Sequence, residues 1–333
     1  MSFDTAHQLI TDLVKDFKAN EKYYLTSDYS EAQVRKDFID KFFIALGWDV
    51  NHDTQKNPYE QEVIVEKSVS DKKRADYMFT LGPKFREPKF FVEAKKPSRS
   101  LKNVDDYFQT LRYGWNAQNP FAILTDFEEF HILDSRYKPD PKYVLDKSFR
   151  RFHYTDYLDK EKFSEIYYLL SRESVADNSI EKRASELPKP RGKAIQKGLF
   201  AYSTQSIDES FLDMLDDIRL RLARSLKKNN IYLDGEVLTE STQRIIDRLV
   251  YIRFLEDKDI EPERHISTYG EKGNAWKDFI SDSKWFNAKY NGIVFRENNI
   301  IDKPTFNGPD ENEFANICNE ISHINSPYDF RYI

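Results

Sequence analysis

Apolar residues recur at helical spacing in two segments near the N-terminus of this chain. The first segment begins after Asp4 and repeats large apolar side chains every three or four residues as far as Phe17. In the second, Ser30 and Gln33 have the spacing of a capping box, an apolar stripe follows, and Gly47 is a natural stop. Both patterns predict helices that bury one face.

Shorter apolar runs, rich in β-branched and aromatic residues, predict strands after these helices. The predicted strands span residues 62–66, 74–81, 89–95, 121–125 and 129–133, and further predicted helices span residues 104–117 and 163–170. A Gly-Pro turn separates the second and third strands, which predicts a hairpin. The order α–β–β–β–α–β–β predicts an α/β (α+β) domain over residues 1–172.

The second half of the chain has a different pattern. Residues 173–206 are polar and interrupted by proline and glycine, which predicts a linker. Beyond them, apolar stripes at helical spacing run from Phe211 to Leu226 and from Ile245 to Ile252, whereas residues 269–309 show no clear period. We therefore predict an all-α domain over residues 207–333.

Composition excludes several classes of protein. No apolar run is long enough to span a bilayer, and the acidic N-terminal segment does not fit a secretory signal. Cys318 is the single cysteine, so no disulfide framework can form within the chain and a cytoplasmic location is expected. The six histidines show no metal-ligand spacing, which argues against zinc chemistry and against Cys–His catalysis.

The net charge of −6 conceals a basic segment. Between Lys67 and Lys102, eleven basic residues stand against four acidic ones, which gives a local charge of +7. Such a segment could neutralise DNA phosphates. A solvated hairpin with protective lysines explains the same charges, and the charge pattern alone does not choose between the two interpretations.

Three charged residues of the predicted hairpin could form a metal site. Side chains alternate along a strand, so Glu93 and Lys95 point to one face. A hairpin that sets Leu81 opposite Pro88 also sets Asp76 opposite Glu93, with Cβ atoms about 5 Å apart. Two carboxylates at that distance repel each other unless a cation lies between them, and Mg²⁺ favours such carboxylate sites. Lys95 could then orient a water molecule and stabilise charge on a phosphate.

The alternative interpretation is an exposed hairpin face on which Asp76 and Glu93 form salt bridges with Lys95 and Arg74. The apolar residues 90–92 before Glu93 argue against it, because they mark a buried central strand. An acid and a lysine at the end of such a strand are costly without a function.

These residues resemble a known family. Asp76 with Glu93-Ala94-Lys95 resembles the PD-(D/E)XK nuclease signature, and the order of elements is similar to the core of that superfamily. The segments 31–50, 74–77, 91–97, 109–113 and 124–130 resemble the N-terminal nuclease domain of type IIG and type I-like restriction–modification enzymes. Residues 253–257 resemble the helical connector that joins this nuclease to an adenine-specific DNA methyltransferase.

The resemblance implies roles for individual residues. Asp76 and Glu93 would bind Mg²⁺, the Ala94 carbonyl could add a ligand, and Lys95 would be the catalytic lysine. The remaining implied site residues are Gln109 and Tyr113, which match a Gln-x-x-x-Tyr element, and Glu31, which matches an acid of the first helix. DNA contacts are expected from Lys73, Arg74, Lys96 and Arg99.

Three of these roles have simpler explanations, and one position departs from the signature. Gln109 and Tyr113 also fit a surface glutamine and a half-buried tyrosine, and Glu31 fits an acid that favours a helix N-terminus. Ala75 stands before Asp76 where the signature has proline, a departure that puts little in doubt.

The expected function is Mg²⁺-dependent cleavage of double-stranded DNA in a restriction–modification enzyme that defends against foreign DNA. Expected partners are methyltransferase and target-recognition domains, in cis or in trans, and a transient dimer is plausible for cutting both strands. No S-adenosylmethionine loop or Asn-Pro-Pro-Tyr motif is present, so that cofactor would belong to the methyltransferase. We interpret the chain as a piece of a longer protein or a separate restriction subunit. The alternatives are a non-cleaving DNA-binding scaffold and a RecB-like repair nuclease.

Overall fold

The computed structural model describes the chain except for residues 55–56, 66–74, 189–206, 270, 272 and 332–333. It divides into two units, Met1–Thr204 and Gln205–Ile333.

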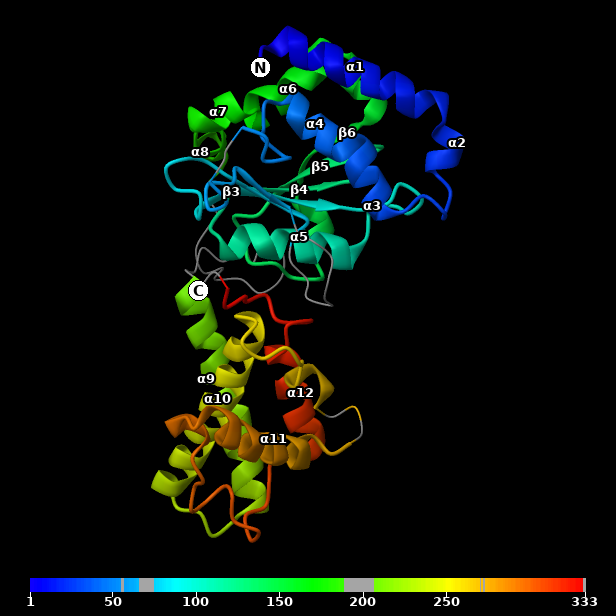
Figure 1. Cartoon of the computed structure of the whole chain (residues 1–333). Coiled ribbons are helices and arrows are strands. Elements are labelled where there is room, and N and C mark those ends of the chain that lie inside the picture. The colour runs from blue at the N-terminus through cyan, green and yellow to red at the C-terminus, as the bar shows by residue number, and fades with distance from the viewer. Residues whose placement is uncertain (55–56, 66–74, 189–206, 270, 272, 332–333) are drawn as a thin grey trace. The chain divides into compact units, whose positions relative to one another are not determined.

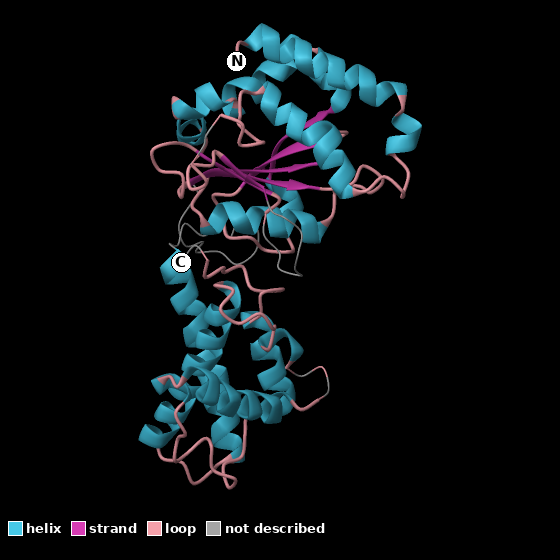
Figure 2. Ribbon diagram, in the orientation of Figure 1, coloured by secondary structure: helices cyan, strands magenta, loops and turns pink. Residues whose placement is uncertain are grey.

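The first unit contains a six-stranded mixed sheet whose strands follow one another in chain order. The strands are β1 (Val63–Val65), β2 (Tyr77–Thr80), β3 (Pro88–Ala94), β4 (Phe121–Thr125), β5 (Glu129–Asp134) and β6 (Ser148–His153). Neighbouring strands are antiparallel except β3 and β4, which are parallel and joined by a helical crossover. Figure 2 shows the sheet between two layers of helices.

Helices cover both faces of this sheet. Figure 1 shows α5 on one face and α1, α4 and α6 on the other. The helices of this unit are α1 (Phe3–Ala19), α2 (Glu21–Tyr24), α3 (Glu31–Val34), α4 (Asp40–Ala45), α5 (Val104–Asn116), α6 (Lys160–Leu170), α7 (Arg172–Ala176) and α8 (Ser179–Glu186), with 3₁₀ turns η2 (Val144–Lys147) and η3 (Tyr154–Leu158). Every residue of β4 is buried, as expected for a strand covered on both sides.

The second predicted helix forms with an irregular centre. The capping box of Ser30 and Gln33 is confirmed, and Gly47 follows the last turn with a φ of +92°, a conformation that favours glycine. Between α3 and α4, however, residues Arg35–Ile39 form a π-helical turn, η1. The apolar stripe is uninterrupted there, so the hydrophobic pattern gives no signal of this turn.

Three predictions for this unit need correction. The expected linker does not begin at residue 173, because α7 and α8 bury Val175 and Ile180 in the main core. The rest of that segment, residues 189–206, lies outside the described residues. Strand β6 was not predicted, because its two adjacent arginines break the alternating pattern at an exposed edge. The hairpin turn also differs, since a bulge sets Thr80, rather than Leu81, opposite Pro88.

The second unit is helical, as predicted. Its elements are α9 (Ile207–Asn229), α10 (Gly235–Asp257), η4 (Ile266–Thr268), α11 (Ala275–Tyr290), η5 (Ile293–Phe295) and α12 (Glu311–Ile321). The apolar stripes of α9 and α10 meet in one core that also contains Cys318. Helix α11 lies inside the segment without a clear period. Among the residues that the structure describes, no helix is both long and apolar enough to cross a membrane.

The motif at residues 253–257 forms a buried polar cluster in this unit. The Arg253 guanidinium pairs with Asp257 and donates to the carbonyl oxygens of Ile321, at 2.9 Å, and Tyr328, at 3.2 Å. The second oxygen of Asp257 accepts the Phe330 amide at 3.0 Å. We call these residues the Arg253 cluster. It ties the C-terminal segment to helix α10, which is a structural role for the motif that resembles the connector.

His131 makes the stability of the first unit depend on pH. Its ring is buried, its Nδ1 lies 2.8 Å from the Tyr107 hydroxyl, and burial, with Arg151 and Lys102 nearby, lowers its pKa from 6.5 to about 4. In the unfolded chain, His131 therefore binds a proton below pH 6.5, whereas in the folded chain it binds one only near pH 4. We expect this residue to cost about 1–2 kcal/mol of stability between pH 7 and pH 5.

Urea unfolding of the wild type and of His131→Gln at pH 7 and pH 5 measures this effect. Glutamine can still accept the Tyr107 hydroxyl, but it does not titrate, so the variant should lose less stability over this interval. An equal loss in both proteins would contradict the assignment.

Candidate catalytic site

The hairpin register brings the two predicted metal ligands together. Tyr77 pairs with Val92 and Phe79 with Phe90, which confirms the predicted register, and one further step sets Asp76 opposite Glu93. Glu93 lies on the face of β3 that carries Phe91, whose ring packs against Tyr113 of α5. The side chains of Asp76, Glu93 and Lys95 are only 13%, 4% and 11% exposed, which contradicts the exposed face of the alternative interpretation, although the contact between Glu93 and Lys95 that it expected is present.

Glu93 is held by two donors. The Lys95 ammonium lies 2.5 Å from Glu93 Oε1, and the Gln109 amide donates to the same oxygen at 2.8 Å. The Gln109 amide also lies 2.9 Å from the Tyr113 hydroxyl, one helical turn along α5. The structure therefore places both members of the Gln-x-x-x-Tyr element at the site, where they fix the position of the glutamate.

The other oxygen of Glu93 has no hydrogen-bond partner among the described residues, although it is buried. Burial and the neighbouring Asp76 carboxylate raise the pKa of Glu93 to about 8, and Lys95 only partly opposes this shift. Burial alone would lower the pKa of Lys95, but the charges of Glu93 and Glu31 outweigh it and raise that pKa. The Glu93 carboxyl group is therefore difficult to ionise, whereas the neighbouring Lys95 amine keeps its positive charge.

Asp76 is held by donors from two other elements. Its Oδ2 accepts the Ala94 amide at 2.8 Å, and its Oδ1 accepts Nη1 of Arg35 at 2.7 Å. Ala94 was expected to offer its carbonyl oxygen to a metal. It is the amide of Ala94 that contacts the site acid, and the carbonyl ligand stays a prediction.

Glu31 lies at the rim of the site. Its carboxylate is 4.0 Å from the Lys95 ammonium and its side chain is 41% exposed. Burial raises its pKa, with Lys95 acting in the opposite direction. Glu31 is also the first residue of α3, where its charge favours the helix N-terminus, and its role as a site acid stays a prediction.

The predicted DNA contacts are only partly described. Lys73 and Arg74 lie outside the described residues. Arg99 forms an ion pair with Asp106, and Lys96 is half-buried directly after the site lysine. Contacts of Lys96 and Arg99 with phosphates stay predictions.

Asp76 and Glu93 have the chemistry to hold Mg²⁺. This ion prefers oxygen ligands and commonly binds one or two carboxylates while keeping several waters. The buried, unpartnered Glu93 oxygen and the repulsion between the two acids fit such an ion. No group of three or more histidine, cysteine, aspartate or glutamate side chains suited to a metal occurs in the described part of the chain, so a metal here would rely on these two acids, water and backbone.

Sequence reasoning missed Arg35, which contacts Asp76 from the other side of the site. The available signal was its position four residues after Glu31, which places both side chains on one helical face. The partner of Arg35 could not be read from local sequence, because Asp76 lies 41 residues further along the chain.

Comparison with known proteins gives one relationship. No family profile matches the chain, and no solved structure matches it. The chain is 31% identical over 290 residues to the type II restriction enzyme and methyltransferase RM.Eco57I of Escherichia coli. The match covers 85% of this chain and 27% of that protein, so the chain spans about a quarter of the length of its relative. Over most of its length, the chain is thus related to part of a restriction–modification enzyme.

Proposed function

We propose that this chain provides the Mg²⁺-dependent DNA endonuclease of a type IIG-like restriction–modification enzyme, built as a PD-(D/E)XK domain followed by a helical connector. The observation that carries the proposal is the arrangement at the end of β3. Asp76 accepts the amide of Ala94, the residue after Glu93, and the Lys95 ammonium is 2.5 Å from that glutamate, with all three side chains largely buried. The relationship to RM.Eco57I and the mixed sheet covered by helices support it.

Each residue would have a defined task in phosphodiester hydrolysis. Mg²⁺ held by Asp76 and Glu93 would neutralise charge on the scissile phosphate. Lys95 would orient the attacking water and stabilise the negative charge that develops on the phosphate oxygens. Gln109 would keep Glu93 in place, with Tyr113 supporting Gln109.

The other parts of the proposal concern partners and place. The substrate is double-stranded DNA, and its target sequence would be chosen by recognition and methyltransferase regions in cis or in trans. Two copies of the site would cut the two strands through transient dimerisation. The activity would operate in the cytoplasm, and S-adenosylmethionine would serve only the methyltransferase.

Cleavage by a Lys95→Met variant tests this proposal. In the complete protein that contains this chain, we expect plasmid cleavage with Mg²⁺ and none with EDTA. Lys95→Met should reduce the rate by about 10²–10³-fold, because removing one stabilising donor from a reaction centre has an effect of this order. Lys15→Met is the matched control, since Lys15 lies on α1, outside the basic segment, with an exposed side chain and should cut normally.

One observation favours a second candidate, a DNA-binding scaffold that does not cleave. Arg35 and Lys95 already provide a positively charged contact for each of Asp76 and Glu93 without any metal. DNA binding that is indifferent to metal, with no cleavage by the wild type, would support the scaffold and reject the nuclease. Cleavage confined to linear DNA would instead support the RecB-like alternative.

A further inference from the structure

Arg35 occupies one side of the candidate metal ligand Asp76. Its Nη1 donates to Asp76 Oδ1 at 2.7 Å, and its Nη2 lies 3.4 Å from the Asp76 carbonyl oxygen. Both side chains are largely buried, at 15% and 13% exposure, so water screens this pair weakly. The contact joins η1 to the start of β2.

Tyr77 also contacts the guanidinium of Arg35 and fixes its position. The guanidinium lies over the Tyr77 ring, 4.9 Å from the centroid, and its Nε is 3.4 Å from the Tyr77 hydroxyl. That hydroxyl donates to Asp40 at 2.6 Å, in the turn of helix directly after η1. The π-helical turn that begins at Arg35 and these aromatic and carboxylate contacts fix the positive charge at one position.

A divalent cation on the Asp76 carboxylate would lie close to this charge. The ion binds a carboxylate oxygen at about 2.1 Å, and Arg35 already donates to the same carboxylate. Lys95 adds a second cation on the Glu93 side. The ion would therefore enter between two resident positive charges, and like charges in a poorly screened site repel strongly.

We propose that Arg35 supplies a fixed positive charge beside the metal site. Because this charge is held against Asp76, the site binds a divalent cation weakly when no DNA phosphate is present. This inference rests on the proposed function, because it assigns the metal to Asp76 and Glu93. It goes beyond that function because it assigns control of metal binding to Arg35, a residue outside the nuclease signature. The scissile phosphate would supply the negative charge that offsets Arg35.

Mn²⁺ binding to the DNA-free protein, measured by calorimetry, tests this role. Arg35→Gln removes the charge but keeps an amide that can donate to Asp76, and Arg35→Met removes both. We expect about tenfold tighter Mn²⁺ binding by these neutral variants and binding within about twofold of wild type for Arg35→Lys. If Arg35 only held Asp76 in place, both neutral variants would bind Mn²⁺ more weakly than the wild type, because a less ordered Asp76 binds metal less well.

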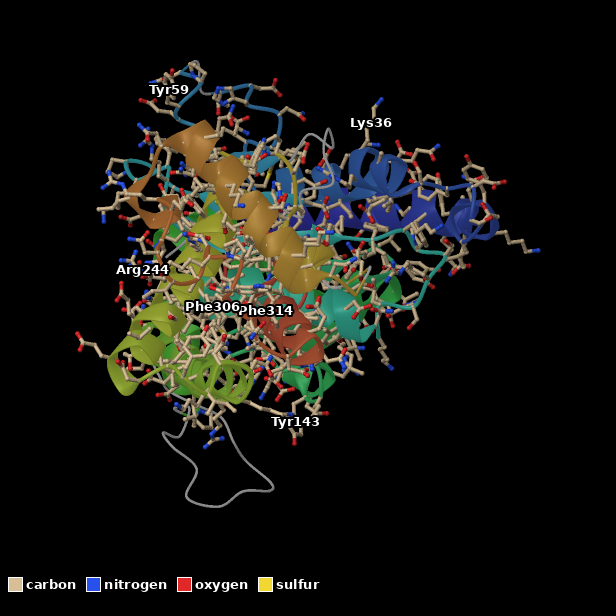
Figure 3. All side chains as sticks on the ribbon, turned by 90° about the horizontal axis from the view of Figure 1, so that it is seen from below. Lys36, Tyr59, Tyr143, Arg244, Phe306 and Phe314 are labelled. Carbon is tan, nitrogen blue, oxygen red and sulfur yellow. The ribbon has the colours of Figure 1, made fainter. Side chains whose placement is uncertain are left out.

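The matched control is Lys36→Met. Figure 3 shows Lys36 directed away from the ribbon, on the same π-helical turn as Arg35, and its removal should leave Mn²⁺ affinity unchanged. Unchanged or weaker binding by both neutral variants would overturn the inference while the nuclease proposal stands. If instead no Mn²⁺ binding depends on Glu93, as judged with Glu93→Gln, the metal assignment fails and both ideas fall.

Discussion

We expect Glu93→Gln to reduce DNA cleavage strongly and to remove a loss of stability that the metal-free protein undergoes as the pH rises. Glutamine has nearly the same shape, and its carbonyl oxygen can still accept from Lys95 and Gln109, so the packing at the end of β3 should survive. It does not supply the negative charge that a divalent ion requires, and the cleavage rate should fall on the order of a thousandfold. Plasmid cleavage under saturating Mg²⁺ measures this loss.

This loss of stability follows from the raised pKa of Glu93. In the unfolded chain this glutamate ionises near pH 4.5, whereas in the folded protein its pKa is about 8. The folded state therefore keeps a proton that the unfolded state loses, and stability falls as the pH rises from 4.5 to 8. Glutamine does not titrate, so the stability of Glu93→Gln relative to the wild type should be higher at pH 8 than at pH 4.

Urea unfolding at the two pH values, without metal, separates this effect from a general change in packing. Glu87→Gln is the matched control, because Glu87 lies in the same hairpin with an exposed side chain. A gain of equal size at both pH values would show that the charge of Glu93 is not responsible. A variant whose stability relative to the wild type is lower at pH 8 than at pH 4 would contradict the raised pKa of Glu93.

The second large effect is expected from Arg253→Met in the helical unit. Methionine would remove the guanidinium that pairs with the buried Asp257 carboxylate and donates to the carbonyl oxygens of Ile321 and Tyr328. Breaking one side of a buried pair costs about 3–5 kcal/mol, because the remaining charge stays desolvated. The unfolding transition of this unit, followed by circular dichroism, should move to lower urea concentration.

Arg244→Met provides the comparison within the same helix. Arg244, marked in Figure 3, pairs with Glu240 at 2.9 Å on the exposed side of α10. Exposed pairs contribute about 0–1 kcal/mol, so this variant should unfold almost like the wild type. Similar losses in both variants would mean that the Arg253 cluster does not hold the C-terminal segment.

The elements that could be predicted from sequence are those whose signals are local. The capping box of Ser30 and Gln33, the apolar stripes of α9 and α10, and the runs that became β3 and β4 each depend on spacing within a few residues. Strand β6 and helices α7 and α8 escaped prediction because their burial depends on distant partners. The arginines of β6 lie at the sheet edge, and Val175 and Ile180 reach a core formed mostly by residues far earlier in the chain.

The candidate site divides in the same way. A hairpin fixes the distance between Asp76 and Glu93 once its register is known, and alternation along β3 places Lys95 beside Glu93. Helical spacing in α5 similarly predicts that Gln109 and Tyr113 share a face. Arg35 could not be found this way, because its contact with Asp76 depends on how η1 packs against the sheet.

The bulge between Phe79 and Thr80 separates the hairpin loop from Asp76 and Glu93. The stacked rings of Phe79 and Phe90, 4.3 Å apart, hold the strands in register on the side of the acids, while the pairing shifts by one residue on the loop side. The bulge lies between the loop and Asp76, so a change in the loop would alter the strand pairing at the bulge before it affected Asp76. We therefore expect that residues 82–87 can be lengthened, shortened or fitted with a reporter group without moving the two carboxylates apart.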